Sequence, residues 1–260
     1  PKYIVDYIVN NTVREYIQGK SFEEIKKVKI LDPACGSGSF LLRAFDILIE
    51  ESEKSLKRNL KYEEKVNLIL NCIYGVDLDK RACDIAKLNL SLKMAERGQK
   101  LPMLRDNIRM GNSLIDDKNI AGYKAFVWQE EFKEIMDNGG FDIVVGNPPW
   151  GAELNEKEKE YLIQKYILVP SKTKDTYLYF ITKAIELLKK EGHFGIIIPN
   201  TWLLINNTEN FRKMLLEYNL TEIIDLGDGV FGEATVESSI IILKKENSKN
   251  KSCKVMRFKK

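Results

Sequence analysis

Histidine is nearly absent from this sequence, and cysteine is scarce and unpaired. The only histidine is His193, and the four cysteines form no CxxC pair and show no paired spacing. A single histidine excludes most histidine-based metal sites, so we expect no bound metal. Unpaired cysteines favour a reducing, cytoplasmic compartment. The sequence also lacks a signal peptide and any apolar run long enough to span a bilayer, so no membrane association is expected.

The sequence also lacks a large excess of charge of either sign, because 41 Lys and Arg against 38 Asp and Glu leave a net charge of only +3. Such a balance does not identify a nucleic-acid binder by itself. Residues 244–260, however, hold eight basic side chains and one acidic one. This tail is interpreted either as a solvated lysine-rich hairpin or as a contact for phosphates. The chain begins at Pro1, which indicates either a processed start or a piece excised from a longer protein.

What the sequence does contain is an alternation of strand-like and helix-like segments over 260 residues. With 44% hydrophobic residues, it predicts one domain spanning 1–260, of α/β class, with a mainly parallel sheet and an antiparallel edge hairpin. The expected strands are 28–31, 72–76, 108–110, 141–145, 193–198, 222–226 and 237–243, and the expected helices are 39–50, 80–97, 175–190 and 210–218. We expect an exposed helical insertion at 51–67, irregular structure at 112–140 and a mobile lid at 151–174.

The segment KILDPACGSGSFLLRAF (29–45) is interpreted as a strand, a glycine turn and a helix start. Gly36 and Gly38 allow a tight bend and a close approach of a ligand to free N–H groups. The spacing is not that of a dinucleotide GxGxxG loop, and Asp32 would repel a phosphate. Together they favour a nucleoside ligand that carries an ammonium and a carboxylate. The alternative is a tight turn without a ligand.

Two further strands are expected to end on polar side chains. Asp77 ends the strand in IYGVDLD, where an α/β sheet holds a ribose by both hydroxyls. Asp79 is interpreted as a helix N-cap. Asn112 in GNSLI follows the third strand and is either an acceptor for an adenine amino group or a turn asparagine.

The stretch FDIVVGNPPW (141–150) ends a buried strand with two prolines and an indole. Pro148 and Pro149 lack an N–H and fix φ, so the strand stops and leaves carbonyl acceptors unpaired beside Trp150. With the Asn147 side chain, these form a rigid set of acceptors that suits a planar ligand bearing an NH₂ group.

Taken together, these motifs resemble the S-adenosylmethionine-dependent methyltransferases, in particular the γ-class adenine-N6 DNA methyltransferases. This resemblance implies a doubly wound, Rossmann-like fold. The cofactor motifs come first, NPPW lies in the middle and Phe231 comes late, which is the γ order. PKYIVDYIV (1–9) is similar to the opening helix of that family, and residues 128–150 are similar to type IIG restriction-modification enzymes.

The resemblance implies a role for each matching residue. It places S-adenosylmethionine against Asp32, Pro33, Ala34, Gly36, Gly38, Asp77, Leu78, Asn112, Ser113, Asn147 and Phe180. It assigns catalysis to Asn147, Pro148, Pro149 and Trp150, and stacking of the target base to Trp150 and Phe231. Asn112 stands where the family usually has Asp.

The implied activity is methyl transfer to N6 of an adenine flipped out of duplex DNA, within a restriction-modification system. The implied partner is a target-recognition domain or subunit beyond the C-terminus, and any nuclease would lie before Pro1. Two alternatives stay open: a protein-glutamine or RNA N-methyltransferase that uses the same acceptors, and a module that binds cofactor or DNA without catalysis.

Overall fold

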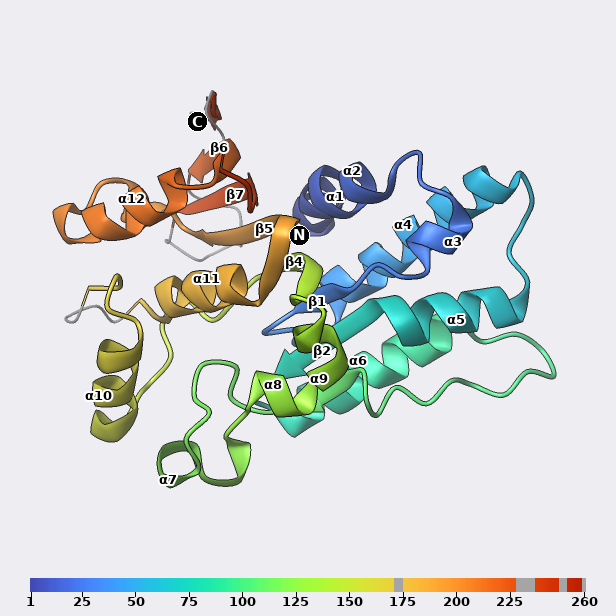
Figure 1. Ribbon diagram of the computed structural model, residues 1–260, viewed down its shortest axis with the longest axis horizontal. Helices are drawn as coiled ribbons and strands as arrows, with labels where there is room; N and C mark the ends of the chain where they lie inside the picture. Colours follow the sequence, from blue (N-terminus) through green and yellow to red (C-terminus); the bar gives the residue numbers. More distant parts are fainter. Residues whose placement is uncertain (171–174, 228–236, 248–251, 259–260) are drawn as a thin grey trace.

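An eight-stranded sheet forms the centre of the molecule in this computed structural model, which describes residues 1–170, 175–227, 237–247 and 252–258 (Figure 1). The strands are β1 Ile30–Asp32, β2 Ile73–Asp77, β3 Ile108–Met110, β4 Phe141–Gly146, β5 Leu188–Pro199, β6 Asn219–Gly227, β7 Ser238–Lys244 and β8 Lys254–Arg257. Their order across the sheet is β3-β2-β1-β4-β5-β7-β6-β8. Only β7 runs antiparallel to its described neighbours, β5 and β6. The predicted α/β class with a mainly parallel sheet is confirmed.

Helices cover both faces of the sheet. On one face lie α1 Lys2–Val9, a π-helical turn Asn10–Arg14, α2 Glu15–Ile17, α3 Phe22–Ile25, α4 Ser39–Leu56, α5 Tyr62–Cys72 and α6 Lys80–Lys93. On the other lie α7 Lys118–Ala121, α8 Trp128–Glu131, α9 Lys133–Asp137, α10 Glu156–Lys165, α11 Thr176–Leu187 and α12 Glu209–Leu216. Figure 1 shows α1, α4 and α5 on one side of the strands and α11 and α12 on the other.

Strand β4 shows why the sheet needs a helix layer on each face. All six of its residues are buried. Ile143 and Val145 pack into the core beneath α4, whereas Val144 packs into the core beneath α11. A strand whose two faces are both buried has a mostly apolar sequence. The segment FDIVV has such a sequence and predicts a buried strand.

The order of the strands creates a crevice at one edge of the sheet. The chain runs from β1 outward through β2 to β3, then returns to place β4 on the other side of β1. The loops that follow β1 and β4 therefore leave the sheet in opposite directions. Ligands of open α/β sheets bind at such a switch point, outside the carboxyl ends of the strands.

Two expectations about the connecting segments were wrong. Residues 112–140 are not irregular, because α7, α8 and α9 lie there around a cluster of buried aromatics. The expected lid at 151–174 contains α10, which begins with a capping box formed by Asn155 and Glu158 and buries Leu162. One buried position in ten residues gives little hydrophobic periodicity, so the capping box was the signal that could have revealed this helix.

The basic tail also contains structure that the sequence did not predict. Its residues 254–257 form β8, which pairs in parallel with β6 and so lies outside the antiparallel strands that were predicted near this edge of the sheet. The expected insertion at 51–67 is helical, but α4 continues through most of its first half and buries Glu51. Within the described ranges, no helix combines the length and the apolarity that crossing a bilayer requires.

Candidate functional site

Two adjoining cavities open at the carboxyl ends of β1, β2 and β4. The smaller cavity, of about 250 Å³, is lined by the glycine loop with Asp32 and Gly36, by the start of α1 and by Asn147. The larger cavity, of about 700 Å³, is lined by residues that include Asp77, Asn112 and Phe180. Ala34 and Asn147 line both cavities. The structure therefore brings most of the predicted site residues to one place, the switch point of the sheet.

Asp32 is the buried acid of the smaller cavity. Its side chain is 1% exposed and accepts a hydrogen bond from the Ala34 N–H at 3.0 Å. Burial, followed by the nearby charge of Asp77, raises the pKa of Asp32 to about 8. No described lysine or arginine forms an ion pair with it. A buried carboxyl group without a protein cation fits a ligand that brings an ammonium group.

Gly146 is a residue whose role the sequence analysis missed. A Cβ atom at this last residue of β4 would lie 2.6 Å from Asp32 Oδ1, closer than real Cβ contacts come. Strand β4 can therefore pass the Asp32 carboxylate only because residue 146 is glycine. The signal was present, because a glycine directly before NPPW stands beside the strand that ends at Asp32.

The glycine turn itself has the predicted geometry. Gly36 and Gly38 have φ values of +52° and +88°, which L side chains rarely adopt. Gly36 lines the smaller cavity, but Gly38 lines neither cavity. A Cβ at Gly38 would lie 3.2 Å from Ala86 Cβ on α6. Gly38 thus serves the turn and the close packing of α4 on α6.

Asp77 connects the two cavity walls at the end of β2. Its Oδ2 accepts from the Gly36 N–H at 2.8 Å, and its Oδ1 accepts from the Asp79 N–H at 2.9 Å. Each carboxylate oxygen has a second lone pair, which leaves acceptors for ligand hydroxyls. Asp79 caps α6 by accepting from the Arg81 N–H, as predicted.

The loop after β3 is fixed by its own hydrogen bonds. Asn112 Oδ1 accepts from the backbone N–H groups of Leu114 and Ile115, at 3.1 and 3.2 Å. Ser113 Oγ donates to the Pro33 carbonyl at 2.6 Å. Pro33, Asn112 and Ser113 all line the larger cavity. Asn112 is therefore a turn asparagine, as one of the two interpretations predicted, and its side chain also borders the cavity.

Leu78 and Phe180 supply apolar surface to the larger cavity. Leu78 follows β2 and is half exposed, and Phe180 lies on α11 with part of its ring accessible. Both side chains can offer apolar surface to a flat base.

The NPPW segment forms the boundary between the cavities. Trp150 Nε1 donates to Asn147 Oδ1 at 2.9 Å. Thr176 Oγ1 donates to the Pro149 carbonyl at 2.8 Å and accepts from the Ala152 N–H at 3.2 Å, so the start of α11 fixes the segment from outside. Pro148 and Trp150 line neither of the two cavities. Phe231, the predicted second stacking residue, lies outside the described residues.

The opening helix forms a wall that sequence reasoning did not place in the site. Pro1, Ile4 and Val5 line the smaller cavity. Figure 1 shows the N-terminus beside the ends of β4 and β5. The apolar side chains in successive turns of this helix, which predict that it packs against the core, were the available signal.

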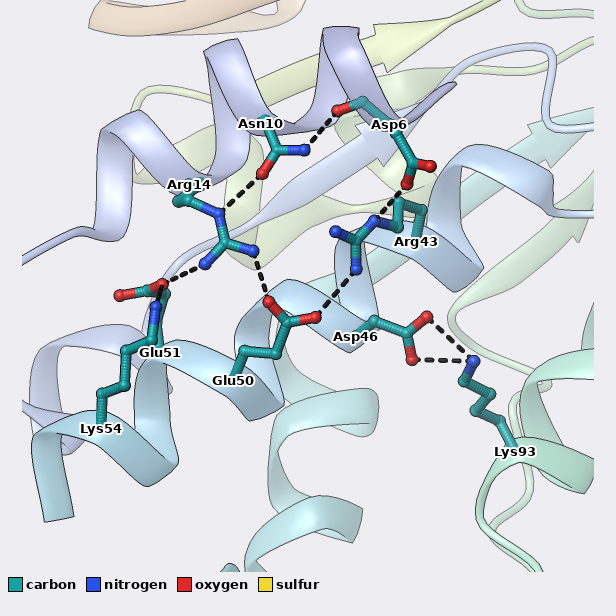
Figure 2. Close-up of polar contacts among 9 residues, drawn as sticks. All are labelled: Asp6, Asn10, Arg14, Arg43, Asp46, Glu50, Glu51, Lys54 and Lys93. Carbon is teal, nitrogen blue, oxygen red and sulfur yellow. Dashed lines mark hydrogen bonds and ion pairs between the residues drawn. The ribbon is translucent and has the colours of Figure 1, made fainter. Parts of the chain in front are cut away.

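A network of charges holds this wall against α4 (Figure 2). Arg43 forms ion pairs with Asp6 of α1 at 2.6 Å and with Glu50 at 2.9 Å. Arg14, in the π-helical turn, bonds Glu50 and the buried Glu51. The two arginines thus share Glu50 and connect the opening helix to the helix that begins at the glycine turn.

Part of the basic tail is used inside the fold. Lys244 pairs with Glu15 at 2.8 Å, and Lys245 donates to the carbonyls of Ile185 and Leu188 at 2.6 and 2.7 Å. Lys254 and Arg257 of β8 pair with acids of β6. Of the eight cations, the four in the described residues therefore have protein partners, which weakens the interpretation of the tail as a free phosphate contact.

Comparisons with known proteins agree with this geometry. Residues 71–231 match the family model described as Eco57I restriction-modification methylase, and residues 24–101 match that of an RMKL-like methyltransferase domain. The chain is 37% identical, over its whole length, to the type II restriction enzyme and methyltransferase RM.Eco57I of Escherichia coli and covers 29% of that protein. It is 29% identical over 94% of its length to the type II methyltransferase M.BstVI of Geobacillus stearothermophilus, of which it covers 41%.

Solved structures share the fold. A nuclease-deletion mutant of the type ISP restriction-modification enzyme LlaGI, in complex with a DNA substrate mimic, superposes with a TM-score of 0.75 at 18% identity, over 99% of this chain and 24% of that one. A Listeria monocytogenes protein assigned to the class I S-adenosylmethionine-dependent methyltransferases gives 0.59 at 19% identity, over 99% and 64%.

The chain spans well under half the length of the curated relatives named above. The family model, by contrast, matches more than half of this chain. S-adenosylmethionine is the cofactor that this family and this fold imply. The chain belongs to the Eco57I restriction-modification methylase family.

Proposed function

We propose that this chain transfers a methyl group from S-adenosylmethionine to N6 of an adenine in duplex DNA, as part of a restriction-modification system. The observation that carries the proposal is the position of Asn147, which lines both cavities. An amide at that junction lies beside the middle of a ligand that extends through both cavities, where it can hold a reacting amine. Several relatives are type I and type II restriction-modification methylases, which supports the same reaction.

The cofactor fits the two cavities by the chemistry of their walls. Asp32 offers a buried carboxylate to an ammonium group in the smaller cavity. Asp77 offers acceptors to the hydroxyls of a ribose, and Leu78 and Phe180 offer apolar surface to a base. S-adenosylmethionine, when bound, supplies a sulfonium methyl group as the electrophile and becomes the thioether S-adenosylhomocysteine. The methylated N6 loses one proton to solvent after transfer.

Asn147 and Pro148 would activate the target amine. The N6 lone pair of adenine is delocalised into the ring, so this nitrogen is a poor nucleophile until its hydrogens are held. Asn147 Oδ1 has a second lone pair beside the one that accepts from Trp150, and the Pro148 carbonyl lacks a strand partner. Acceptors fixed in advance stabilise the positive charge that develops on N6 without reorganising, so no general base is needed before transfer.

The base must leave the helix to reach these acceptors, because a base inside a duplex is inaccessible to a cavity. Trp150 has a flat, half-buried ring next to Asn147 and suits one face of a flipped base. We assign the other face to Phe231. A target-recognition domain or subunit would select the sequence, since the described segments are committed to the sheet, its helices and the cavity walls.

The test is methylation of plasmid DNA by the wild-type chain, Asn147→Ala and the control Asn138→Ala. Asn138 is an exposed asparagine at the end of α9 that bonds the Glu134 carbonyl and lines neither cavity. We expect Asn147→Ala to lower the rate about 10²–10³-fold while keeping cofactor affinity measured by calorimetry, as loss of one positioned polar group does. Asn138→Ala should match the wild type. Transfer by Asn147→Ala near the wild-type rate, or transfer only to peptide or RNA, would overturn the proposal.

A further inference from the structure

The side-chain amide of Asn112 has a defined orientation. Its Oδ1 accepts from the N–H groups of Leu114 and Ile115, at 3.1 and 3.2 Å. Backbone N–H groups only donate, so the side-chain atom that faces them must be the oxygen. The backbone of Asn112 is fixed as well, since its N–H donates to the Lys124 carbonyl at 2.7 Å. The amide therefore cannot turn over without losing two hydrogen bonds.

The other end of this amide is a pair of N–H donors at Nδ2. None of the described residues accepts a hydrogen bond from this nitrogen. Asn112 is half-buried and lines the larger cavity with Asp77 and Phe180. The Asn112 side chain can therefore offer a donor to a ligand, whereas the lone pairs of its oxygen are used by the turn.

The part of the ligand that Asn112 meets follows from the order of the strands. The smaller cavity lies at the end of β1, Asp77 ends β2, and Asn112 follows β3, which is the next strand outward. If the amino-acid end of the cofactor lies at Asp32 and its ribose at Asp77, the base extends toward β3. Asn112 would then border the edge of the base.

We propose that Asn112 reads the adenine of the cofactor as a hydrogen-bond acceptor, by donating from Nδ2 to a ring nitrogen, and does not accept from the 6-amino group. This inference rests on the cofactor placement of the proposed function. It assigns Asn112 as a specificity residue for the ring nitrogens of the base. The 6-amino group is then not required for binding through this residue.

The expectation is tested with analogues of S-adenosylhomocysteine. Removal of the 6-amino group should change the affinity of the wild-type chain less than about threefold. Replacement of one ring nitrogen, N1, N3 or N7, by CH should weaken binding roughly fivefold to tenfold, which corresponds to one neutral hydrogen bond. Calorimetry with each analogue gives these ratios without any requirement for activity.

Asn112→Asp is the informative variant. An aspartate can keep the turn, because one carboxylate oxygen still accepts from the two backbone N–H groups. Its second oxygen replaces the donor by an acceptor, so the variant should prefer the 6-amino compound over the 6-deamino compound by about tenfold or more. Asn71→Asp is the matched control, since Asn71 bonds its own helix away from both cavities, and it should leave the selectivity of the wild type unchanged.

The possible outcomes distinguish a wrong role for Asn112 from a wrong placement of the cofactor. A wild-type loss of tenfold or more on removal of the 6-amino group, or no loss with any of the three ring substitutions, would overturn the role of Asn112 while the cofactor site stands. Failure of S-adenosylhomocysteine itself to bind would overturn the cofactor placement and, with it, this inference. A preference of Asn112→Asp for the 6-amino compound, together with the expected affinity ratios for the wild type, would establish that Asn112 donates to a ring nitrogen.

Discussion

The indole nitrogen of Trp150 donates a hydrogen bond to the side-chain oxygen of Asn147 across 2.9 Å. This bond fixes which end of the Asn147 amide is the oxygen, and that oxygen is the proposed acceptor for the target amine. Because the bond joins residues only three positions apart, it sets the amide before any substrate arrives.

Trp150→Phe should therefore slow methyl transfer about fivefold to tenfold and leave cofactor affinity unchanged. Phenylalanine keeps an aromatic face but loses the N–H donor, and one hydrogen bond of this kind contributes about 1 kcal/mol. Single-turnover methylation at saturating DNA measures the effect. Trp202→Phe is the control, since Trp202 donates to Ser239 Oγ at 3.1 Å within the core: it should lower thermal stability without slowing transfer. Equal transfer rates for both variants would contradict this role of Trp150.

Gly146→Ala should weaken cofactor binding at least tenfold. The new methyl group would lie 2.6 Å from Asp32 Oδ1 and would displace the carboxylate that faces the smaller cavity. Gly192→Ala is a matched control, because its Cβ would meet Leu188 Cγ at 2.7 Å and the Asp142 carbonyl at 2.9 Å near the other end of the sheet. Both changes should cost about 1–3 kcal/mol of stability through overpacking. Only Gly146→Ala should change the affinity that calorimetry measures.

Binding of the cofactor should release a proton at pH 7. Burial raises the pKa of Asp32 from 3.8 to about 8, so this carboxyl is mostly protonated in the ligand-free protein at pH 7. A cationic ligand group selects the ionised form, and the proton must leave. Calorimetry at pH 7 in two buffers of different ionisation enthalpy should give different heats for the wild type and the same heat for Asp32→Asn. Identical heats for the wild type would rule out the coupling.

The same shift fixes the direction of a stability effect. Between pH 3.8 and about 8 the unfolded chain has released this proton and the folded chain keeps it, so Asp32 makes the fold less stable as pH rises through that interval. Asp32→Asn removes the effect. The free energy of unfolding of Asp32→Asn, measured by urea denaturation, should therefore rise relative to that of the wild type as the pH increases from 4 to 8. A constant difference over this interval would show that Asp32 ionises normally.

Arg14→Leu should lower the free energy of unfolding by about 1–3 kcal/mol, because it leaves the buried Glu51 with a single partner, Lys54. Cofactor affinity should fall with it, since Arg14 connects the opening helix to α4. Lys93→Ala breaks only the more exposed pair with Asp46 and should cost less than about 1 kcal/mol, without any effect on affinity. Similar losses for the two variants in urea denaturation would argue against a network.

The main parts of the site could be predicted because they lie where strands end. Hydrophobic runs located β1, β2 and β4, and parallel strands bring their carboxyl ends to one edge. Asp32, Asp77 and Asn147 therefore fall together although they are far apart in sequence. The turn at Gly36 could be predicted as well, because it depends on the local sequence directly after β1.

What the sequence did not reveal depends on contacts across the fold. The wall formed by Ile4 and Val5 needs the docking of α1 on α4, and the bond between Arg14 and Glu51 joins residues 37 positions apart. The orientation of the Asn112 amide depends on how its own loop closes. Short helices such as α8 follow from aromatic packing, which overrides weak local periodicity.

The two outermost described strands, β3 and β8, limit the ways in which this sheet can grow. β3 has three residues, and the Arg109 at its centre pairs with Glu131 and lies over the ring of Phe132 at 4.9 Å. β8 has four residues and carries Lys254 and Arg257 on acids of β6. A strand from another molecule would have to pair beside short, charged edges. Lateral addition of strands, the first step of edge-to-edge aggregation, is thereby disfavoured at both ends of the sheet.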